Sequence, residues 1–390
     1  MTFSGDSVSI YLHIPFCSTK CTYCAFNTYI NLDALIPAFI DALIKEIAWV
    51  GQGNIYNTVH TIYFGGGTPS LLTPGQFAQV LDAIYTYFNV DVDAEVSTEA
   101  NPNDLSLSYL RGLKQAGINR LSIGMQTANS PELVLFDRRH DTVDVINSVK
   151  VARQAGFDNL SLDLIYGFPQ QTMQSWERSL QVVADLQPEH LSLYALGLEA
   201  GTPLDNWVNQ GKLDLPEDDL TADMYDYATH YLHQHGYEQY EISNWAKPGR
   251  ACAHNLQYWR NQPYLGLGPG AHGYANQIRY STILSPQQYI QRMQEVSTGL
   301  AFPHTPATRN ATVVDYESEI AETLMMHLRL LQEGLPRQSF EQRFDVDVMT
   351  LYGDKLRRFE QNGLLQIDMD AIRITQQGRL ISNVIFRELI

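Results

Sequence analysis

Short apolar runs alternate with amphipathic stretches from residue 8 to about residue 195 of the chain. The amphipathic stretches carry apolar residues at helical spacing, as at Leu35, Phe39, Leu43 and Ile47, and so predict helices. The apolar runs predict buried strands. There are six of them, at residues 8–14, 59–64, 94–98, 120–124, 160–165 and 190–194. Such alternation is typical of repeated β-α units around a parallel sheet.

Two of the predicted helices end in the same sequence, Gln-Ala-Gly, at residues 115–117 and 154–156. Glycine ends a helix because it adopts the left-handed conformation without a steric penalty. Six β-α units are too few for a closed eightfold barrel, so we predict an α/β fold with a partial (β/α)6 barrel. Such folds place their chemistry at the carboxyl ends of the strands, and the open side of the barrel would admit a large substrate.

The alternation is lost after about residue 196, where Gly, Pro, Tyr, Trp and His become frequent. Here the pattern predicts a helix over residues 218–235, a loop-rich stretch over residues 244–274 and a short helix over residues 286–296. This region would connect the barrel to a third part of the chain.

The third part begins with a predicted helix over residues 318–331, which carries Ile320, Leu324, Leu328 and Leu331 on one face. Two helices and two short strands follow, at residues 337–344, 350–362, 364–368 and 371–375. Together they predict a small C-terminal winged-helix-like domain. We therefore expect three parts: a barrel over residues 1–200, a connecting region over residues 201–305 and a C-terminal domain over residues 306–390.

The chain is acidic: 26 of its 390 residues are basic and 43 are acidic, which gives a formal net charge of −17. This charge argues against nonspecific binding to nucleic acid or to an anionic membrane surface. Winged helices often bind DNA, but residues 329–390 hold nine basic and nine acidic residues with no basic stripe, so we predict no nucleic-acid partner. No basic apolar leader and no apolar run near the ~18 residues of a membrane span is present, which predicts a cytoplasmic protein.

Three of the four cysteines, Cys17, Cys21 and Cys24, follow the first predicted strand with the spacing C-x3-C-x2-C. Thiolates at this spacing can converge on one iron–sulfur cluster, whereas a disulfide across so short a loop is strained. Three ligands would leave one iron of a cubane open to bind a small molecule. The alternatives are a zinc site, which needs a fourth ligand that His13 is badly placed to supply, and a disulfide, which a reducing compartment disfavours. The remaining thiol, Cys252, is expected to be structural.

The cysteine spacing, with Tyr23 before the last cysteine, resembles the signature of the radical S-adenosylmethionine (radical SAM) superfamily. The longer string from Tyr11 to Cys17, Tyr-Leu-His-Ile-Pro-Phe-Cys, is similar to the branch that holds oxygen-independent coproporphyrinogen III dehydrogenase and related heme chaperones. The resemblance covers nearly the whole chain. It implies a [4Fe-4S] cluster on the three cysteines, with SAM on its open iron and reductive cleavage of SAM to a deoxyadenosyl radical.

The run Gly65-Gly66-Gly67-Thr68-Pro69 follows the second predicted strand directly. Glycines at a strand end let the backbone approach a ligand closely, and a plain tight turn is the alternative. The resemblance implies that Gly66, Gly67 and Thr68 hold the amino group of the methionine part of SAM.

Polar residues also stand at the ends of the next strands, at Glu99, Gln126 and Asp163. A buried polar side chain must bond a ligand or a neighbour, although each of these could instead cap a helix. Arg138 follows, and its guanidinium can pair with a carboxylate. The resemblance implies that these four residues contact SAM and that two aromatic residues complete the site, Tyr11 and Tyr23.

The sequence His254-Asn255-Leu256-Gln257-Tyr258-Trp259 matches the HNxxYW pattern of the heme chaperones, where it is implicated in heme binding. A neutral imidazole is a good iron ligand, and aromatic rings can stack on a porphyrin. Without the resemblance, a packed aromatic loop with a hydrogen-bonded histidine would be the preferred interpretation. With it, we predict that His254 binds heme.

Two functions within the branch compete. The dehydrogenase would use the radical to convert propionate side chains of coproporphyrinogen III to vinyl groups, whereas the chaperone would bind heme and pass it to an acceptor protein. Phe26 stands where the dehydrogenases carry a further cysteine, and only about ten residues precede Tyr11 where they have a longer leader. Both departures favour the heme chaperone. We assign no catalytic residue, expect SAM cleavage, and leave a homodimer and peripheral contact with membrane proteins open.

Overall fold

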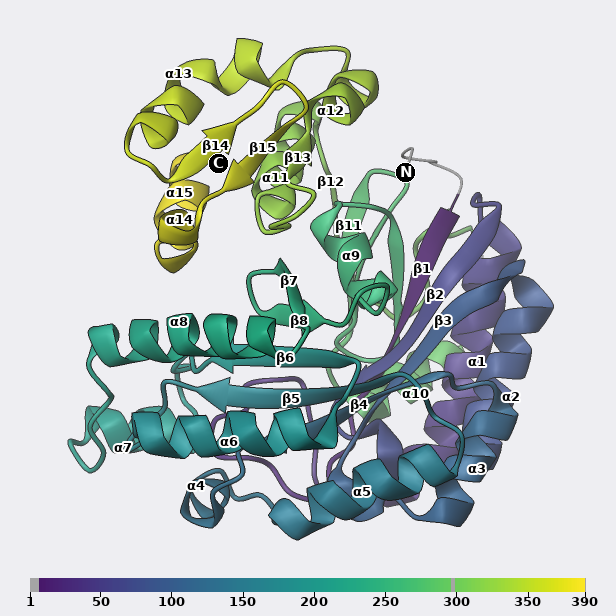
Figure 1. Ribbon diagram of the computed structural model, residues 1–390. Coiled ribbons are helices and arrows are strands. Elements are labelled where there is room, and N and C mark those ends of the chain that lie inside the picture. Colours follow the sequence, from purple (N-terminus) through teal and green to yellow (C-terminus); the bar gives the residue numbers. More distant parts are fainter. Residues whose placement is uncertain (1–6, 296–298, 390) are drawn as a thin grey trace.

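Six parallel strands in chain order form the centre of the molecule, and helices cover their outer face (Figure 1). The structure is a computed structural model that describes residues 7–295 and 299–389. The elements are β1 Ser7–Ile14, α1 Ile36–Gly53, β2 Thr58–Gly66, α2 Pro74–Tyr87, β3 Val90–Ala100, α3 Leu107–Ala116, β4 Arg120–Gln126, α4 Ser130–Leu135, α5 Thr142–Gln154, β5 Leu160–Tyr166, α6 Met173–Leu186 and β6 His190–Ala195. Each predicted strand is present, so the predicted partial barrel of six β-α units is confirmed.

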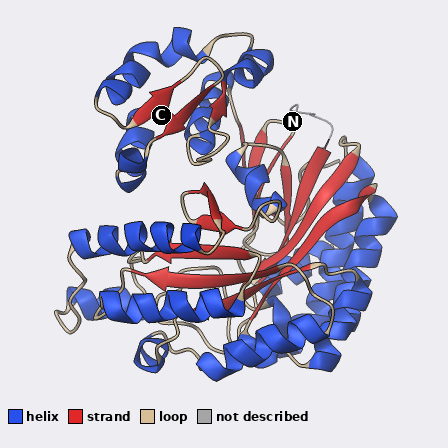
Figure 2. Cartoon of the chain, in the orientation of Figure 1, coloured by secondary structure: helices blue, strands red, loops and turns tan. Residues whose placement is uncertain are grey.

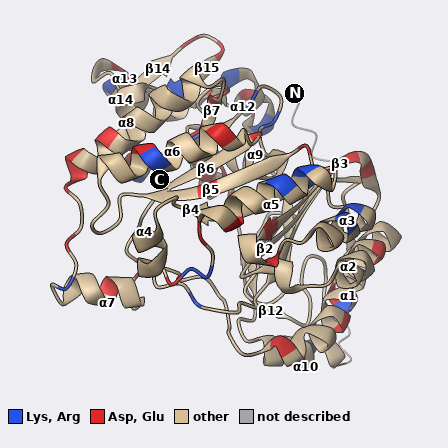
Figure 3. Cartoon of the chain, turned by 60° about the horizontal axis from the view of Figure 1, so that its bottom comes forward, with Lys and Arg blue, Asp and Glu red and all other residues tan. Residues whose placement is uncertain are grey.

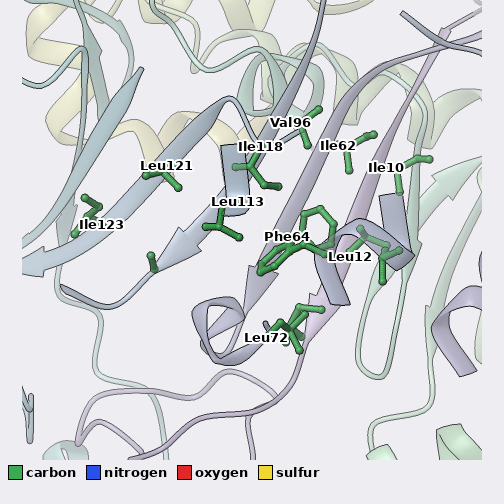
Figure 4. Close-up of a cluster of buried hydrophobic side chains, with 14 of the residues drawn as sticks. Ile10, Leu12, Ile62, Phe64, Leu72, Val96, Leu113, Ile118, Leu121 and Ile123 are labelled. Atoms are coloured by element: carbon green, nitrogen blue, oxygen red, sulfur yellow. The ribbon is translucent and has the colours of Figure 1, made fainter. Parts of the chain in front are cut away.

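Alternate side chains of each strand face opposite sides of the sheet. Ile62 and Phe64 of β2, like Leu121 and Ile123 of β4, belong to the main hydrophobic core (Figure 4). The helices pack along this apolar side (Figure 2). Tyr63, between these core positions of β2, faces the inside of the barrel and lines a cavity. One strand pattern thus supplies both the core and the site.

The two predicted glycine helix ends are confirmed. Gly117 follows α3 with φ of 109°, and Gly156 follows α5 with φ of 92°. In both, the residue after the glycine donates its N–H to a carbonyl in the last turn: Ile118 to Leu113 O and Phe157 to Ala152 O. These bonds satisfy helix carbonyls that would otherwise lack partners.

Both edges of the parallel sheet carry strands that the sequence pattern did not predict. On the β1 edge, β9 Tyr264–Leu267 pairs in parallel with β1, and β10 His272–Ala275, β11 Ile278–Thr282 and β12 Thr308–Val313 follow. On the β6 edge lie β8 Asn244–Ala246 and β7 Glu238–Glu241. These strands are three to six residues long and depend on pairing with distant strands, so they have no clear periodic signal of their own.

The predicted loop-rich stretch over residues 244–274 contains short strands and the helix α9 Ala253–Trp259. The helices α8 Asp218–Gln234 and α10 Pro286–Gln294 agree with the predicted ones, while α7 Pro203–Asn209 was not predicted. Residue 296, the predicted end of the last of these helices, lies outside the described residues. So do residues 1–6, 297–298 and 390 of the predicted domains.

The C-terminal part has its own three-stranded sheet and its own core. Its elements are α11 Tyr316–His327, β13 Leu335–Pro336, α12 Arg337–Phe344, α13 Val348–Gln361, β14 Leu365–Ile367, β15 Ala371–Ile374, α14 Gln376–Leu380 and α15 Ser382–Leu389. This order of helices and strands agrees with the predicted winged-helix-like domain. The helix predicted over residues 318–331 ends earlier, at His327. The chain leaves it to pair with β7, where the Leu331 N–H donates to Tyr240 O.

Charged contacts join the C-terminal domain to the barrel. Arg260, just after α9, pairs with Glu333 at 2.7 Å, and Arg329 pairs with Glu241 of β7. The Arg329 guanidinium also lies 4.2 Å from the ring centre of Trp259. Helix α9 therefore lies between the barrel and the C-terminal domain (Figure 1).

The positions of Lys and Arg and those of Asp and Glu are interspersed along the ribbon in Figure 3. Within the described ranges, no helix combines the length and apolarity needed to cross a membrane.

Candidate functional site

Polar side chains gather at the carboxyl ends of the parallel strands around one cavity of about 800 Å³. The loop after β1 and the ends of β2 to β6 supply its walls. Most of the predicted site residues line it: Cys17, Cys21, Tyr23, Cys24, Gly66, Gly67, Thr68, Glu99, Gln126, Arg138 and Asp163. Two predicted residues, Tyr11 and His254, are not among its lining residues.

The three cysteines of the loop after β1 are free thiols; Cys17 is buried and the other two are half-buried. Backbone bonds fix where the loop begins, because the Cys17 N–H donates to Tyr29 O at 2.9 Å. The Thr22 hydroxyl, between the second and third cysteines, donates to Leu135 O at 2.8 Å. The thiols are therefore presented from a loop that is tied at the first cysteine and again between the second and the third.

Residues that follow β9 and β11 anchor the far side of the cysteine loop. Asn27 Nδ2 donates to Pro269 O at 2.9 Å and to Leu284 O at 3.0 Å. The Tyr29 hydroxyl also donates to Leu284 O, at 3.3 Å. Residues far apart in the sequence thus determine where the cysteines lie.

Two donors approach the cysteine sulfurs. The Thr68 hydroxyl donates to Cys17 Sγ at 3.4 Å, and Arg138 Nη1 donates to Cys21 Sγ at 3.7 Å. Burial raises the pKa of the Cys17 thiol, while the Thr68 bond lowers it; burial also raises the pKa of Cys24. Donors directed at sulfur stabilise the thiolate, which is the form that binds iron. This donor set suits a cluster with thiolate ligands.

Among residues 7–295 and 299–389, no three histidine, cysteine or acidic side chains are arranged to hold a single metal ion. This arrangement is compatible with a cubane, because its cysteine ligands bind different iron atoms and need not meet at one point. The three sulfurs face one cavity beside a glycine turn. The residues present therefore fit a [4Fe-4S] cluster.

The glycine turn packs directly on the start of the cysteine loop. The Gly67 N–H donates to Ile14 O and the Thr68 N–H to Phe16 O, each at 2.8 Å. A Cβ on Gly67 would lie 2.6 Å from Phe16 O and 3.1 Å from Cys17 Sγ, so only glycine fits there. Gly66 has φ of 112°, and a Cβ on it would lie 2.6 Å from the His13 ring.

Glu99, at the end of β3, faces the cavity and is held by two donors. The Tyr63 hydroxyl donates to Oε1 and the Gly66 N–H to Oε2, each at 3.1 Å. Burial and the nearby Asp163 carboxylate raise the pKa of Glu99 to about 7, although both hydrogen bonds and the charge of Arg120 lower it. Its charge therefore changes near neutral pH.

Asp163 of β5 also lies near the guanidinium of Arg120. The Ser122 hydroxyl donates to its two oxygens, at 3.0 and 2.9 Å, and the Ser161 hydroxyl donates at 3.3 Å. Burial raises the pKa of Asp163, and its hydrogen bonds and Arg120 oppose that shift. The cavity thus holds two neighbouring carboxylates, which suit a cationic ligand.

Arg138 reaches from the loop after α4 to the ends of two strands. Its Nη2 donates to Asn101 Oδ1 at 2.6 Å and to Gly124 O at 2.8 Å, while Nη1 faces Cys21. Gln126 has φ of 65°, a conformation that is uncommon outside glycine and recurs at functional sites. Both residues line the cavity.

Two aromatic residues flank the cysteines differently. Tyr23 packs edge-on against Phe136, with ring centres 4.9 Å apart, and lines the cavity. Phe26 also lines the cavity, but its side chain is 68% exposed. A large apolar side chain so exposed beside the cysteines is a candidate contact for an apolar ligand or partner.

Tyr11 and His254 form an aromatic group behind the cavity wall. Their ring centres are 6.4 Å apart, and both lie near Tyr63, which does line the cavity. His254 is 1% exposed, and its two ring nitrogens bond the Thr61 and Tyr258 hydroxyls at 2.7 and 2.9 Å. Burial lowers the pKa of His254 to about 3, so the imidazole is neutral. As placed, it offers no free nitrogen to a ligand.

Cys252 is fully buried, and its thiol donates to Glu95 Oε1 at 3.3 Å. Burial raises its pKa to about 12. A buried neutral thiol is inert, which agrees with the structural role expected for it.

Some cavity residues were missed in the sequence. Tyr63 and Asn255 line the cavity, as does Arg120, which is 2% exposed and whose Nε has no hydrogen-bond partner among the described residues. A period of two along each strand could have found Tyr63, two residues before the glycine turn. Asn255 could not be placed this way, because it lies on α9 and reaches the barrel from another part of the chain.

Comparisons with known families match two parts of the chain. The family model of the radical SAM superfamily matches residues 11–183, and that of the HemN C-terminal domain matches residues 314–381. The solved structure of coproporphyrinogen III oxidase (HemN) from Escherichia coli, a radical SAM enzyme, has a similar fold. Its TM-score is 0.83 at 25% identity, over 98% of this chain and 90% of that one. This likeness supports the partial barrel with its C-terminal domain.

Relatives resemble the chain over its full length. The heme chaperone HemW of Bacillus subtilis is 37% identical, over 97% of this chain and 98% of the relative. The heme chaperone HemW of Lactococcus lactis is 36% identical, over 98% and 97%. The mitochondrial radical S-adenosyl methionine domain-containing protein 1 of Bos taurus is 34% identical, over 99% and 88%.

The fit of Gly67 against the cysteine loop can be tested. We expect Gly67→Ala to displace the loop, because the added Cβ meets Phe16 O and Cys17 Sγ, and so to lower the iron content of anaerobically reconstituted protein well below that of the parent. Gly75→Ala is the matched control, since a Cβ there meets only Thr73 Oγ1, at 3.9 Å. Equal iron content in the parent and in Gly67→Ala would contradict the predicted cluster position.

Proposed function

Because the chain belongs to the heme chaperone HemW family of the radical SAM superfamily, we propose that it binds heme and transfers it to an acceptor protein. The proposal includes a [4Fe-4S] cluster on Cys17, Cys21 and Cys24, with SAM on its open iron. It is supported by full-length similarity to HemW proteins and by a cavity in which these cysteines face two carboxylates.

Phe26 is the residue that most favours the chaperone over the dehydrogenase. It occupies the position of a further cysteine in the dehydrogenases and places an exposed apolar ring at the cavity. The alternative, oxygen-independent coproporphyrinogen III dehydrogenase, is favoured by the fold shared with the Escherichia coli oxidase. The two functions differ in whether a porphyrinogen is changed or a heme is passed on unchanged.

Different residues of the cavity would hold different parts of the cofactors. Gly66, Gly67 and Thr68 would hold the methionine end of SAM, and Glu99 and Asp163 would attract its positive charge. When bound, the cluster and SAM supply a reductively generated organic radical. Gln126 and Arg138 would complete the contacts. Tyr23 would form part of the apolar wall.

Heme binding by His254 would need a local change. The imidazole is neutral, as an iron ligand must be, but Nε2 is occupied by the Tyr258 hydroxyl. Heme iron would therefore have to displace this hydroxyl, so Tyr258 competes with heme for the same nitrogen.

We place this function in the cytoplasm, because all four cysteines are free and cluster ligands need a compartment that keeps thiols reduced. An acceptor protein of unknown identity completes the proposal. A homodimer and peripheral contact with membrane proteins remain predictions.

The first test separates the two functions. Cluster-loaded protein is incubated without oxygen with SAM, a reductant and coproporphyrinogen III, and deoxyadenosine and porphyrinogens are followed together. We expect deoxyadenosine to form while the porphyrinogen is unchanged. Cys21→Ser, which removes one cluster ligand, should form no deoxyadenosine. Protoporphyrinogen accumulating over many turnovers would establish the dehydrogenase instead.

The heme site predicts opposite effects of two substitutions. His254→Ala should weaken heme binding about tenfold or more by removing the ligand, whereas Tyr258→Phe should strengthen it by freeing Nε2. Heme titrations followed by absorbance would measure both affinities. Unchanged affinity and stoichiometry in His254→Ala would show that another residue binds the iron.

SAM binding should depend on pH through Glu99. With a pKa of about 7, the ionised fraction of Glu99 rises from roughly 10% at pH 6 to roughly 90% at pH 8, so affinity for the cationic cofactor should increase several-fold. Equilibrium dialysis of cluster-loaded protein against SAM at several pH values would measure this increase. Glu99→Gln should lose it, while any effect from ionisation of SAM itself should persist. The same pH dependence in both proteins would exclude Glu99 as its source.

A further inference from the structure

The N-terminus of α9 lies inside the partial barrel, where a carboxylate of β3 fixes it. Glu95 accepts hydrogen bonds from the backbone N–H groups of Ala253 and His254, at 3.1 and 3.2 Å, and from the Cys252 thiol. An acidic group at the start of a helix is stabilising, because it satisfies free N–H groups and complements the helix dipole. The helix that carries the HNxxYW motif is therefore held firmly against the strands.

The His254 ring is fixed from both of its nitrogens. Thr61 of β2 and Tyr258 of α9 hold Nδ1 and Nε2, so the imidazole cannot turn without losing a hydrogen bond. Its flat face stacks on Tyr63, with ring centres 5.0 Å apart and planes inclined by 25°. A neutral ring held in this way presents a defined surface to the tyrosine.

Tyr63 connects this ring to the cavity. Its hydroxyl donates to Glu99 Oε1 at 3.1 Å. Within the described residues, the only other hydrogen bond to this carboxylate comes from the Gly66 N–H. Tyr63 itself lines the cavity, whereas His254 does not. A shift of the imidazole would thus move the Tyr63 ring, and with it the hydroxyl that orients Glu99 in the cavity.

We propose that His254 is a positioning residue of the cofactor cavity, which orients Glu99 through Tyr63. The inference rests on the proposed contact between Glu99 and SAM. It goes beyond that contact by assigning the histidine a role in heme-free protein, in which there is no heme iron for it to bind.

The test measures SAM binding to cluster-loaded, heme-free protein by equilibrium dialysis. Tyr63→Phe should weaken binding about tenfold, since it removes a hydrogen bond to a charged group. His254→Phe, which keeps a ring but loses both hydrogen bonds, should weaken it about threefold to tenfold. His60→Gln is the matched control: His60 of β2 bonds Gln257 of α9 at 2.9 Å and Ser9 at 3.4 Å, and the described residues show no ring contact between it and Tyr63. Its SAM affinity should match that of the parent.

The double variant separates positioning from general support of the fold. If His254 acts through the Tyr63 hydroxyl, then His254→Phe should cause no further loss of SAM affinity in protein that already carries Tyr63→Phe. Additive losses would overturn the proposal. So would parental affinity in His254→Phe with a full complement of iron. If that variant does not fold, Tyr258→Phe removes only one hydroxyl from the imidazole and should weaken SAM binding in the same direction; parental affinity there would count against the proposal.

SAM binding by Glu99→Gln distinguishes two negative outcomes: that His254 has no positioning role, and that Glu99 does not contact SAM. Weaker SAM binding in Glu99→Gln, together with parental binding in His254→Phe, would overturn the positioning role alone. Parental binding in Glu99→Gln would overturn the proposed SAM contact and the positioning role with it.

Discussion

Each strand of the barrel buries apolar side chains on one face and polar side chains on the other. The buried polar side chains need hydrogen-bond partners inside the barrel. Glu95, Glu99 and Asp163 stand inside the barrel, where an unpaired carboxylate is costly. The start of α9 satisfies the first, Tyr63 and the glycine turn the second, and serine hydroxyls the third. Arg120 adds a positive charge near them. The cofactor cavity lies where these internal partners leave space for a ligand.

Much of this arrangement could be predicted because its signals are local. The six strands have apolar runs, the helices have periodic faces, and the glycine ends of α3 and α5 depend on a few neighbouring residues. The cysteine spacing, with the string from Tyr11 to Cys17, indicated the superfamily, and the comparisons confirm that resemblance. Residues at strand ends were assigned to one site because parallel strands bring their carboxyl ends to the same edge. That reasoning correctly grouped the residues that line the cavity.

The rest depended on contacts between distant segments. The short edge strands exist only through pairing with β1, β6 and one another. Arg120 shares a strand face with Ser122 and Gly124, but it stands at the first position of β4, away from the carboxyl end where the site was predicted. The HNxxYW motif was recognised from its letters, but its place inside the barrel follows from Glu95 and Thr61, more than 150 residues earlier. Because of this placement, His254 is not an open ligand: heme would have to break its hydrogen bond with Tyr258 before binding it.

The anchoring of the cysteine loop has a consequence for biosynthesis. Asn27 and Tyr29 depend on the carbonyls of Pro269 and Leu284, and β1 gains its second neighbour only from residues 264–267. A nascent chain therefore lacks these anchors of its cysteine loop until nearly three quarters of the protein has been translated, although the contacts with the glycine turn and with Leu135 can form earlier. Iron–sulfur assembly factors acting before that point would meet an accessible, adaptable loop, whereas those acting on the released protein would meet one already locked against the sheet edge.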